Sequence, residues 1–328
     1  MKHDENACYY ESAFATHMAD FIHYKRAQGI KYAAVPLSLR RFSRFLSTKG
    51  SDGTGIDKEL IDEWCSLRPN ENKQTQLRRF VETRQFLKYL AGKGISVYLP
   101  RTMRKLRTKG SFVPYIFSNE ELQRFFKKCD RVRARTPSVM PMLLPVLFRL
   151  LLSCGLRISE TLALRLSDVD LDNDTLTIRM SKFNKDRIVP LSDSILAVLK
   201  DYRFAYHKIP KGDSTFFFAH RDGRAIRQDN IYMWYRKLLW AAGISHGGRG
   251  NGPRVHDFRH TFAVYSLKSM ADKGMDIYCA LPLLSTYLGH ATVSATSEYA
   301  KLAQDMFPEI VEKTSAIAAF VIPGGDRP

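Results

Sequence analysis

The sequence predicts a two-domain, mainly α-helical protein that also contains a small antiparallel β-sheet. The chain has 328 residues, which is more than one average domain holds. Apolar residues recur at helical spacing in both halves, whereas residues 172–191 alternate apolar and polar side chains around a polar turn. Hydrophobic residues make up 45% of the chain, which is enough for a buried core.

Residues 1–98 are expected to form an N-terminal bundle of four helices. The first helix is predicted within residues 10–29 and ends at Gly29, and the second ends at Gly50. The third follows a capping Asp57, and the fourth lies within residues 72–94. The residues expected to face inward are Phe14, Met18, Phe21 and Ile22 in the first helix, and Leu77, Phe80, Val81, Phe86, Leu87 and Leu90 in the fourth.

Residues 99–116 are predicted to be a basic linker between the domains, because they combine prolines, a glycine and a cluster of positive charge. The basic residues are Arg101, Arg104, Lys105, Arg107 and Lys109. Such a cluster is either a solvated surface or a strap that follows a phosphate backbone.

Residues 117–328 are predicted to form the second domain, which mixes helices with the sheet. Residues 139–156 are strongly apolar, but Arg149 and two prolines interrupt them, so a buried helix is favoured over a membrane span. Residues 172–191 are expected to form a β-hairpin with lysines at its tip, and residues 214–226 a further short strand. The tail, residues 301–321, is expected to form one more helix, which packs on its own domain or on a neighbouring subunit.

The charge of the chain points to a polyanionic partner. Its net charge is +18, which nucleic acid would balance most simply, although a basic soluble protein without such a partner would have the same composition. The five cysteines are scattered without paired spacing, so we expect reduced thiols, no zinc site and a cytoplasmic location. No secretory signal and no phosphate-binding loop of the Walker type is evident, and no cofactor or membrane partner is expected.

The stretch "HDFRH" places His256 and His260 four residues apart, on one face of a predicted helix. A zinc-protease helix would need a glutamate after the first histidine and a third ligand at suitable spacing, and neither is present. His260 alone could be a core residue, since it lies between two phenylalanines. Arg259 offers a planar, permanently charged donor, and a histidine beside it suits recognition of a phosphate.

Three further stretches complete a pattern. "GLRISE" places Arg157 at a helix start with Glu160 one turn later, and "KFNKDRIVPL" places Lys182 at the hairpin tip. "LGHATVSATSEYA" contains His290 and Tyr299. Taken in this order and spacing, the four stretches resemble the boxes of the tyrosine recombinase (phage integrase) family over residues 117 to about 305. The N-terminal bundle resembles the SAM-like core-binding domain of that family more loosely.

The resemblance implies a role for each matching residue. Tyr299 would be the nucleophile, and Arg157 and Arg259 would hold the scissile phosphate. His256 would assist proton transfer on the tyrosine side, His290 would hydrogen-bond the phosphate, and Lys182, with Lys185 as its rival, would protonate the leaving oxygen. Glu160 and His260 would support these residues from behind, and the linker residues and Lys185 would bind DNA. Phe258 departs from a common leucine, and residues 271–290 are longer than in compact dimer-resolving members.

The implied activity is site-specific recombination through a 3′-phosphotyrosyl intermediate, without a cofactor. The implied partners are double-stranded DNA sites, three further copies of the chain in a tetramer around a Holliday junction, and accessory DNA-bending proteins. The two domains would clamp the duplex from opposite sides. Integration or excision of a mobile element is favoured over resolution of chromosome or plasmid dimers. The rivals are a type IB topoisomerase and a DNA-binding regulator without activity.

Overall fold

The computed structural model describes residues 10–30, 32, 34–101, 113–133, 138–179, 186–207, 212, 214–247, 252–290 and 292–307. The chain divides into two compact units, residues 1–111 and 112–328. The described elements are mostly helices, and the second unit contains a three-stranded antiparallel sheet. The predicted fold class is therefore confirmed. Within the described residues no helix is long and apolar enough to cross a membrane.

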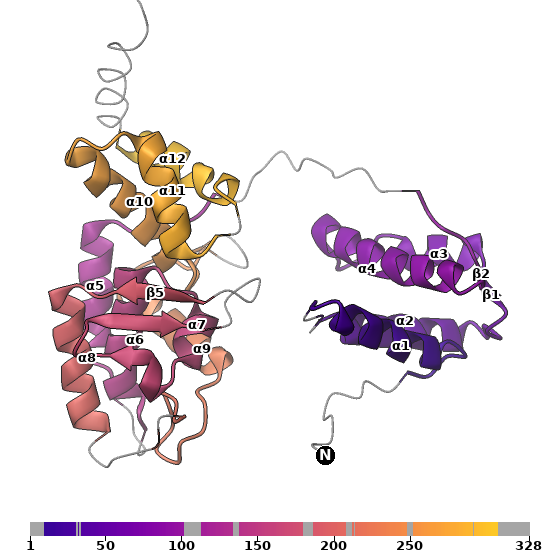
Figure 1. The fold of residues 1–328 in the computed structure, drawn as a ribbon, viewed down its shortest axis with the longest axis horizontal. Helices are drawn as coiled ribbons and strands as arrows, with labels where there is room; N and C mark the ends of the chain where they lie inside the picture. Colours follow the sequence, from indigo (N-terminus) through magenta and orange to yellow (C-terminus); the bar gives the residue numbers. More distant parts are fainter. Residues whose placement is uncertain are drawn as a thin grey trace, which may run out of the picture. The chain divides into compact units, whose positions relative to one another are not determined.

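The first unit contains four helices among its described residues (Figure 1). They are α1 (Ala15–Ala27), α2 (Val35–Thr48), α3 (Lys58–Cys65) and α4 (Lys73–Gly92). The Asp57 carboxylate caps α3 by accepting a hydrogen bond from the Leu60 amide at 2.8 Å. Two short parallel strands, β1 (Gly55–Ile56) and β2 (Ser96–Val97), were not predicted, because two-residue strands leave no alternation to detect.

The core of the first unit follows the predicted stripes with two exceptions, Leu77, which is only half-buried and outside the core cluster, and Val81. Phe14, Met18, Phe21 and Ile22 of α1 are all buried, as predicted. Val81 of α4 is 43% exposed, so its placement in the core was wrong. Thr83 is buried instead, and its hydroxyl accepts a hydrogen bond from the Trp64 indole at 2.9 Å. A polar residue can face the core when a buried donor satisfies it.

The second unit combines helices with the small sheet. Its first helices are α5 (Asn119–Cys129), α6 (Met140–Cys154), α7 (Ile158–Ala163), α8 (Asp193–Tyr206) and α9 (Gln228–Ala241). The sheet is formed by β3 (Val169–Asp170), β4 (Thr175–Ile178) and β5 (Arg187–Pro190), and a 3-10 turn, η1 (Leu166–Asp168), precedes it.

The predicted β-hairpin is confirmed by β4 and β5, which pair antiparallel with Leu176 opposite Val189. Its tip, residues 180–185, lies outside the described residues. The strand β3 was not predicted. The strand predicted within residues 214–226 was wrong, because this segment makes only isolated bridges, Arg165 with Phe216 and Ala219 with Ala225. Its aromatic residues are buried as a loop rather than paired along a strand.

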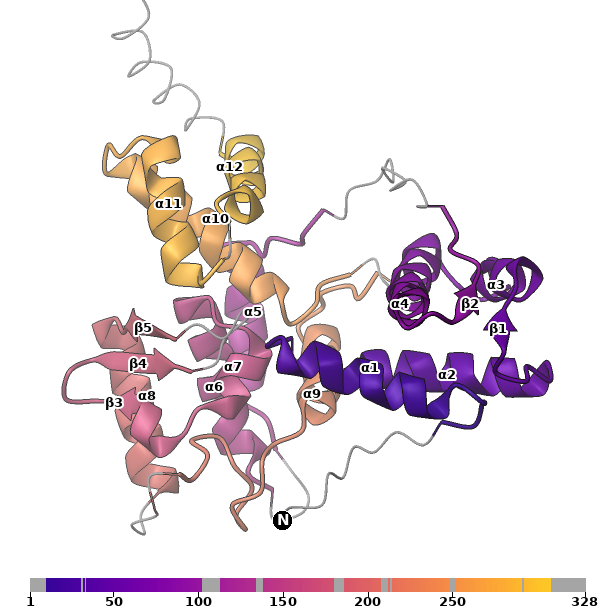
Figure 2. The same cartoon turned by 45° about the vertical axis from the view of Figure 1, so that its right-hand side comes forward.

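Three helices at the end of the described chain form one group (Figures 1 and 2). They are α10 (Asp257–Asp272), α11 (Ile277–Leu288) and α12 (Ser294–Met306). Each packs on the other two, and α10 also packs on α6. The helix α10 therefore connects this group to the core of the unit.

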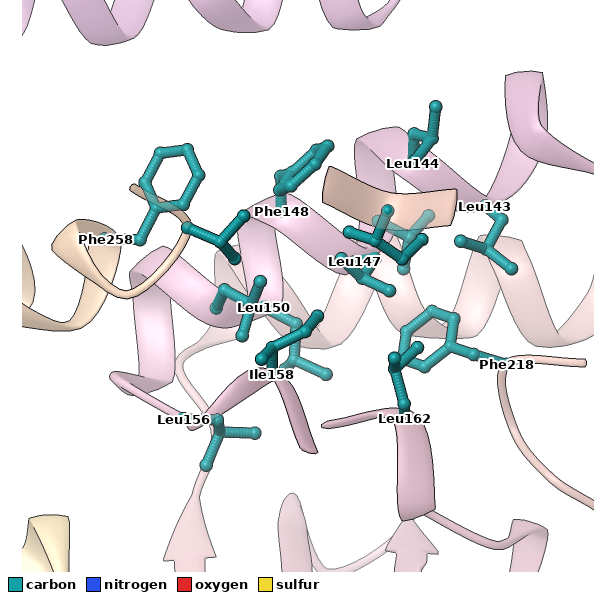
Figure 3. Packing of buried hydrophobic residues seen from close by; sticks show 14 of the residues in the cluster. Leu143, Leu144, Leu147, Phe148, Leu150, Leu156, Ile158, Leu162, Phe218 and Phe258 are labelled. Atoms are coloured by element: carbon teal, nitrogen blue, oxygen red, sulfur yellow. The ribbon is translucent and has the colours of Figure 1, made fainter. Parts of the chain in front are cut away.

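The first turn of α10 is anchored by Phe258, whose side chain is fully buried. Its ring stacks on that of Phe117, with centroids 5.1 Å apart, and lies 5.7 Å from that of Phe148 on α6. Figure 3 shows Phe258 beside Phe148 and near Leu150, which both belong to α6. Because aromatic packing of this kind stabilises the turn, the neighbouring His256 and Arg259 are held in fixed positions.

Candidate active site

A left-handed glycine turn brings Arg157 to the site. The helix α6 ends at Cys154, and Gly155 follows with φ of +58°. A Cβ atom at this position would lie 2.4 Å from Cδ1 of Phe262, so both the backbone angle and the available space require glycine. The chain then reverses, and Arg157 becomes the N-terminal cap of α7.

Glu160 is a buried carboxylate that two arginines share. Its Oε1 lies 2.6 Å from Nη1 of Arg157, and its Oε2 lies 2.9 Å from Nη2 of Arg187. Burial alone would raise the pKa of Glu160, but hydrogen bonds and charge from Arg187 and Arg157 outweigh burial and hold that pKa at about 2. The carboxylate therefore stays charged at neutral pH and orients both guanidinium groups.

Arg259 is the second predicted arginine, and it is 1% exposed. Its Nη1 donates to the Gly155 carbonyl at 2.8 Å and its Nη2 to the Leu288 carbonyl at 2.7 Å. These acceptors lie where α6 and α11 end, at the negative poles of the two helices. Burial and the charge of Arg157 lower the pKa of Arg259 to about 10, so it remains protonated at neutral pH.

A second left-handed glycine closes the site on the side of α11. Gly289 has φ of +66°, and a Cβ atom there would lie 3.1 Å from Nη1 of Arg187. The Gly289 carbonyl accepts from Nη2 of Arg157 at 3.4 Å, and the Tyr287 carbonyl accepts from Nε of Arg187 at 3.0 Å. The end of α11 thus contacts both arginines that hold Glu160, and His290 follows directly.

Tyr299 lies on α12 and is 5% exposed. Its hydroxyl oxygen is 2.8 Å from Nδ1 of His260, and its ring stacks on that of His290 with centroids 6.1 Å apart. Burial raises the pKa of Tyr299, while the positive charges of Arg259 and Arg157 act in the opposite direction. The phenol is therefore protonated at rest and lies in a positively charged surrounding.

His260 and His290 contact Tyr299, His256 contacts His260, and all three histidines are neutral at pH 7. Burial and the nearby arginines lower the pKa of His256 and of His290 to about 4 each. Burial, together with His256 and the arginines, lowers that of His260 to about 3. His256 caps α10 and lies 4.7 Å from the His260 ring, edge to face. His290 pairs through Nδ1 with the Thr296 hydroxyl at 2.7 Å.

The structure thus brings together residues predicted from four separate stretches. Arg157, His256, Arg259, His290 and Tyr299 are linked by contacts between the ends of α6 and α11 and the faces of α10 and α12. His260 contacts the phenol directly, whereas the sequence predicted a supporting or core position for it.

Several predicted residues lie outside the described part of the chain. These residues are Lys182, Lys185, Arg104, Lys105, Arg107 and Lys109. Arg101, the remaining linker residue, is exposed at the end of the described first unit. Among the described residues no group of three or more histidine, cysteine, aspartate or glutamate side chains could hold a metal ion.

Sequence reasoning missed Arg187, Thr296 and Asp257. Arg187 is one of 51 lysines and arginines, and no spacing rule relates the start of a strand to a carboxylate 27 residues earlier. Asp257 was considered only as a failed zinc-site residue, although it is 1% exposed and its carboxylate lies 3.9 Å from Nε2 of His260. A buried acid next to a predicted catalytic histidine was a signal that could have been used.

Comparisons with known proteins agree with this geometry. Residues 116–306 match the model of the phage integrase family. The protein y4rB of Sinorhizobium fredii, an inferred integrase/recombinase, is 30% identical over 307 residues, which cover 92% of this chain and 97% of that protein. Tyrosine recombinase XerD of Caulobacter vibrioides is 29% identical over 281 residues, which cover 82% of this chain and 84% of that protein.

Two solved structures share the fold. The XerH site-specific recombinase bound to its difH substrate aligns with a TM-score of 0.63 and 21% identity, over 88% of this chain and 82% of that chain. The Tn1549 transposon integrase aligns with a TM-score of 0.59 and 17% identity, over 86% of this chain and 94% of that chain. The chain therefore belongs to the phage integrase family. It is a tyrosine recombinase, an enzyme of site-specific DNA recombination.

Proposed function

We propose that this recombinase cuts DNA by attack of the Tyr299 hydroxyl on a phosphodiester. The new bond joins Tyr299 to the 3′-phosphate, and a 5′-hydroxyl is released. The position of the phenol is the main support, because it is buried against the neutral His260 and His290 and is subject to the positive charges of Arg259 and Arg157. A free tyrosine is a weak nucleophile with a pKa near 10, so it needs such a surrounding.

Arg157 and Arg259 would hold the two non-bridging oxygens of the scissile phosphate. Arg157 and Arg187 contact the single carboxylate of Glu160, and the charge of Arg259 acts on the same groups. These three guanidinium groups carry two more positive charges than this carboxylate compensates. Attack on phosphorus builds negative charge on those oxygens. Fixed donors aimed at this charge stabilise the transition state by about 3 kcal/mol each.

His290 and His256 would donate hydrogen bonds to the same phosphate. In this proposal the Thr296 hydroxyl donates to Nδ1 of His290, so that the proton lies on Nε2 and this nitrogen is a neutral donor. The phosphotyrosyl bond is itself a phosphodiester, so the strand can be resealed without ATP. Lys182 would protonate the leaving 5′-oxygen, and Lys185 is the alternative for this role.

The two compact units would share the work of DNA binding. We propose that residues 1–98 bind one part of the recombination site, that residues 99–116 act as a basic linker, and that residues 117–328 cut the strand. The excess positive charge of the chain supports DNA as the partner. Binding should weaken as salt rises, because phosphate contacts release counterions.

The biological reaction that we propose is integration or excision of a mobile element by a tetramer on two DNA sites. The name of the relative y4rB, an inferred integrase/recombinase, supports this reaction. Resolution of chromosome or plasmid dimers is the alternative. We also propose that the C-terminal tail binds a neighbouring subunit. A cavity of about 460 Å³ beside α10, lined by Phe262, Tyr265 and Met270 among others, could accept its apolar residues.

A nicked suicide duplex tests the proposed chemistry. The recognition site is first selected from a library of random-sequence duplexes by binding to the full-length Tyr299→Phe variant. A nick just beyond the scissile phosphate then lets the released 5′-hydroxyl fragment diffuse away, so that a covalent complex accumulates. Wild type should form this complex, and Tyr299→Phe should bind the duplex without forming it.

Two outcomes would contradict the proposal. A covalent complex in Tyr299→Phe would exclude Tyr299 as the nucleophile, and no complex in wild type would exclude cleavage. Relaxation of a supercoiled plasmid that lacks the selected site would instead favour a topoisomerase.

A further inference from the structure

The contact between Tyr299 and His260 gives the nucleophile a defined proton acceptor. The Tyr299 oxygen lies 2.8 Å from Nδ1 of His260, and the two rings lie 5.5 Å apart across the interface of α10 and α12. This distance is that of a good hydrogen bond. His256, one turn earlier on α10, contacts the edge of the His260 ring.

The buried carboxylate of Asp257 lies near the second nitrogen of the His260 ring. Its Oδ1 lies 3.9 Å from Nε2 of His260, on the side of the ring away from Tyr299. The Arg254 amide donates to Oδ2 at 2.6 Å, and the Arg254 guanidinium lies 3.5 Å from Oδ1. Burial raises the pKa of Asp257, and Arg254 opposes that rise. A carboxylate near Nε2 favours a proton there, so the lone pair on Nδ1 faces the phenol.

Bound DNA would make His260 a stronger base. Burial and charges from every element around it keep the ring unprotonated at rest, with a pKa of about 3. The charged and titratable groups that face it are His256, Arg259 and Asp257 on α10, Arg254 before α10, His290 after α11 and Tyr299 on α12. A phosphate between Arg157 and Arg259 would offset the guanidinium charges and so raise the affinity of His260 for a proton.

We propose that His260 accepts the proton of the Tyr299 hydroxyl during strand cleavage, with Asp257 selecting its tautomer. This inference rests on the proposed role of Tyr299 as the nucleophile, and it gives His260 the tyrosine-side role that the family resemblance implies for His256. The bond from the Tyr299 oxygen to phosphorus forms while the bond from phosphorus to the 5′-oxygen breaks. The phenol proton moves to Nδ1 of His260, and the 5′-oxygen takes a proton from Lys182. Resealing reverses both transfers.

The test compares two variants of His260 with Lys182→Ala on the selected suicide duplex. In His260→Asn an amide lies near the position of Nδ1, so it can hold the phenol but cannot take its proton. His260→Ala can do neither. Each protein is assayed in single turnover on the ordinary duplex and on one with sulfur in place of the bridging 5′-oxygen. Sulfur leaves without protonation, so it removes the need for Lys182 but not for a base at Tyr299.

We expect His260→Asn and His260→Ala both to form the covalent complex about 10²-fold more slowly or worse. Sulfur should restore the rate of Lys182→Ala but not that of either His260 variant. The rate of His260→Asn should rise with pH as the phenol ionises by itself, whereas the wild-type rate should stay flat near neutral pH. Asp257→Asn should slow cleavage less than His260→Asn. Unchanged melting temperature and DNA affinity would show that the variants fold.

Several results would overturn the proposal. A wild-type rate in His260→Asn together with a slow His260→Ala would mean that His260 only positions the phenol. Rescue of His260→Asn by sulfur would place His260 on the leaving-group side. Normal cleavage in both variants would remove His260 from the reaction. These outcomes differ from failure of the proposed function itself, in which wild type forms no covalent complex or Tyr299→Phe still forms one.

Discussion

Both units bury an arginine against a carboxylate, but the two arrangements differ in charge balance. In the first unit, Nε of Arg79 lies 3.1 Å from Glu71, and both side chains are 8% exposed. The charges of this buried pair compensate each other, and the Arg79 guanidinium lies over the Trp64 ring at 5.3 Å, as does that of the exposed Arg68 at 4.6 Å. In the second unit, Arg157 and Arg187 contact the single carboxylate of Glu160, and the buried Arg259 adds a third positive charge that acts on the same groups.

We interpret this difference as one between a structural ion pair and the proposed phosphate site. Burying a charge is costly unless a partner compensates it, and the Arg79 pair meets that condition within the protein. The site at Glu160 does not meet it, because Arg259 is nearly fully buried and its hydrogen bonds go to two neutral carbonyls and to the protonated Tyr299 hydroxyl. A bound phosphate would supply the negative charge that compensates the remaining guanidinium groups of this site. Excess buried charge, rather than burial alone, therefore marks the functional region.

The largest effect on cleavage is expected from substitution of Arg259, which carries part of the uncompensated positive charge. Arg259→Lys keeps the charge but loses the planar fork, so it should slow formation of the covalent complex about 10²–10³-fold while DNA binding persists. The matched variant Arg79→Lys should lower the melting temperature and leave cleavage by the folded protein unchanged. Single-turnover assays and thermal melts measure both. Equal losses of cleavage in the two variants would contradict the proposal that Arg259 acts in cleavage and Arg79 only in stability.

The carboxylates should differ in their pH dependence. Glu160 has a pKa of about 2 in the folded protein against an ordinary value of 4.5, so it stabilises the fold above pH 4.5, and this stabilisation is lost as the pH falls toward 2. At neutral pH this shift contributes about 3 kcal/mol to the free energy of unfolding. Glu160→Gln should remove this contribution and should also abolish most of the cleavage activity. The difference from wild type in denaturant unfolding should shrink below pH 4.5.

Glu71→Gln is the control for that experiment. It should destabilise the first unit without changing cleavage of saturating DNA, because Glu71 belongs to the first unit and the candidate site to the second. If Glu160→Gln cleaves normally, Glu160 does not orient the arginines.

The smallest effect is expected from substitution of a glycine with positive φ in each unit, Gly155 and Gly29. Gly155→Ala combines a positive φ with a Cβ contact at 2.4 Å, so it should cost about 2 kcal/mol and also slow cleavage by shifting Arg157. Gly29→Ala has a similar φ of +78° but no atom within 4 Å, so it should cost about 1 kcal/mol and leave cleavage intact. A Gly155→Ala protein with unchanged cleavage would show that the turn does not position Arg157.

Much of the fold was predictable because it depends on local patterns. The stripe of Phe14, Met18 and Phe21 specifies α1, and the capping Asp57 marks the start of α3. The strand predicted at residues 214–226 failed, because buried aromatic residues have the same pattern in a packed loop as in a strand. Val81 failed for a related reason, since the sequence does not show that Thr83 has a buried donor to satisfy it.

The sequence by itself determined the family and its class of reaction, because four stretches in a characteristic order match the tyrosine recombinases. The proposed phosphate clamp and tyrosine nucleophile follow from that resemblance. Only the tertiary structure decided which side chains touch. It placed His260 rather than His256 against the Tyr299 hydroxyl, and it placed Arg187 beside Glu160. These contacts depend on how α10 meets α12 and how β5 meets α7, and no local sequence pattern encodes the distance between elements that are far apart in the chain.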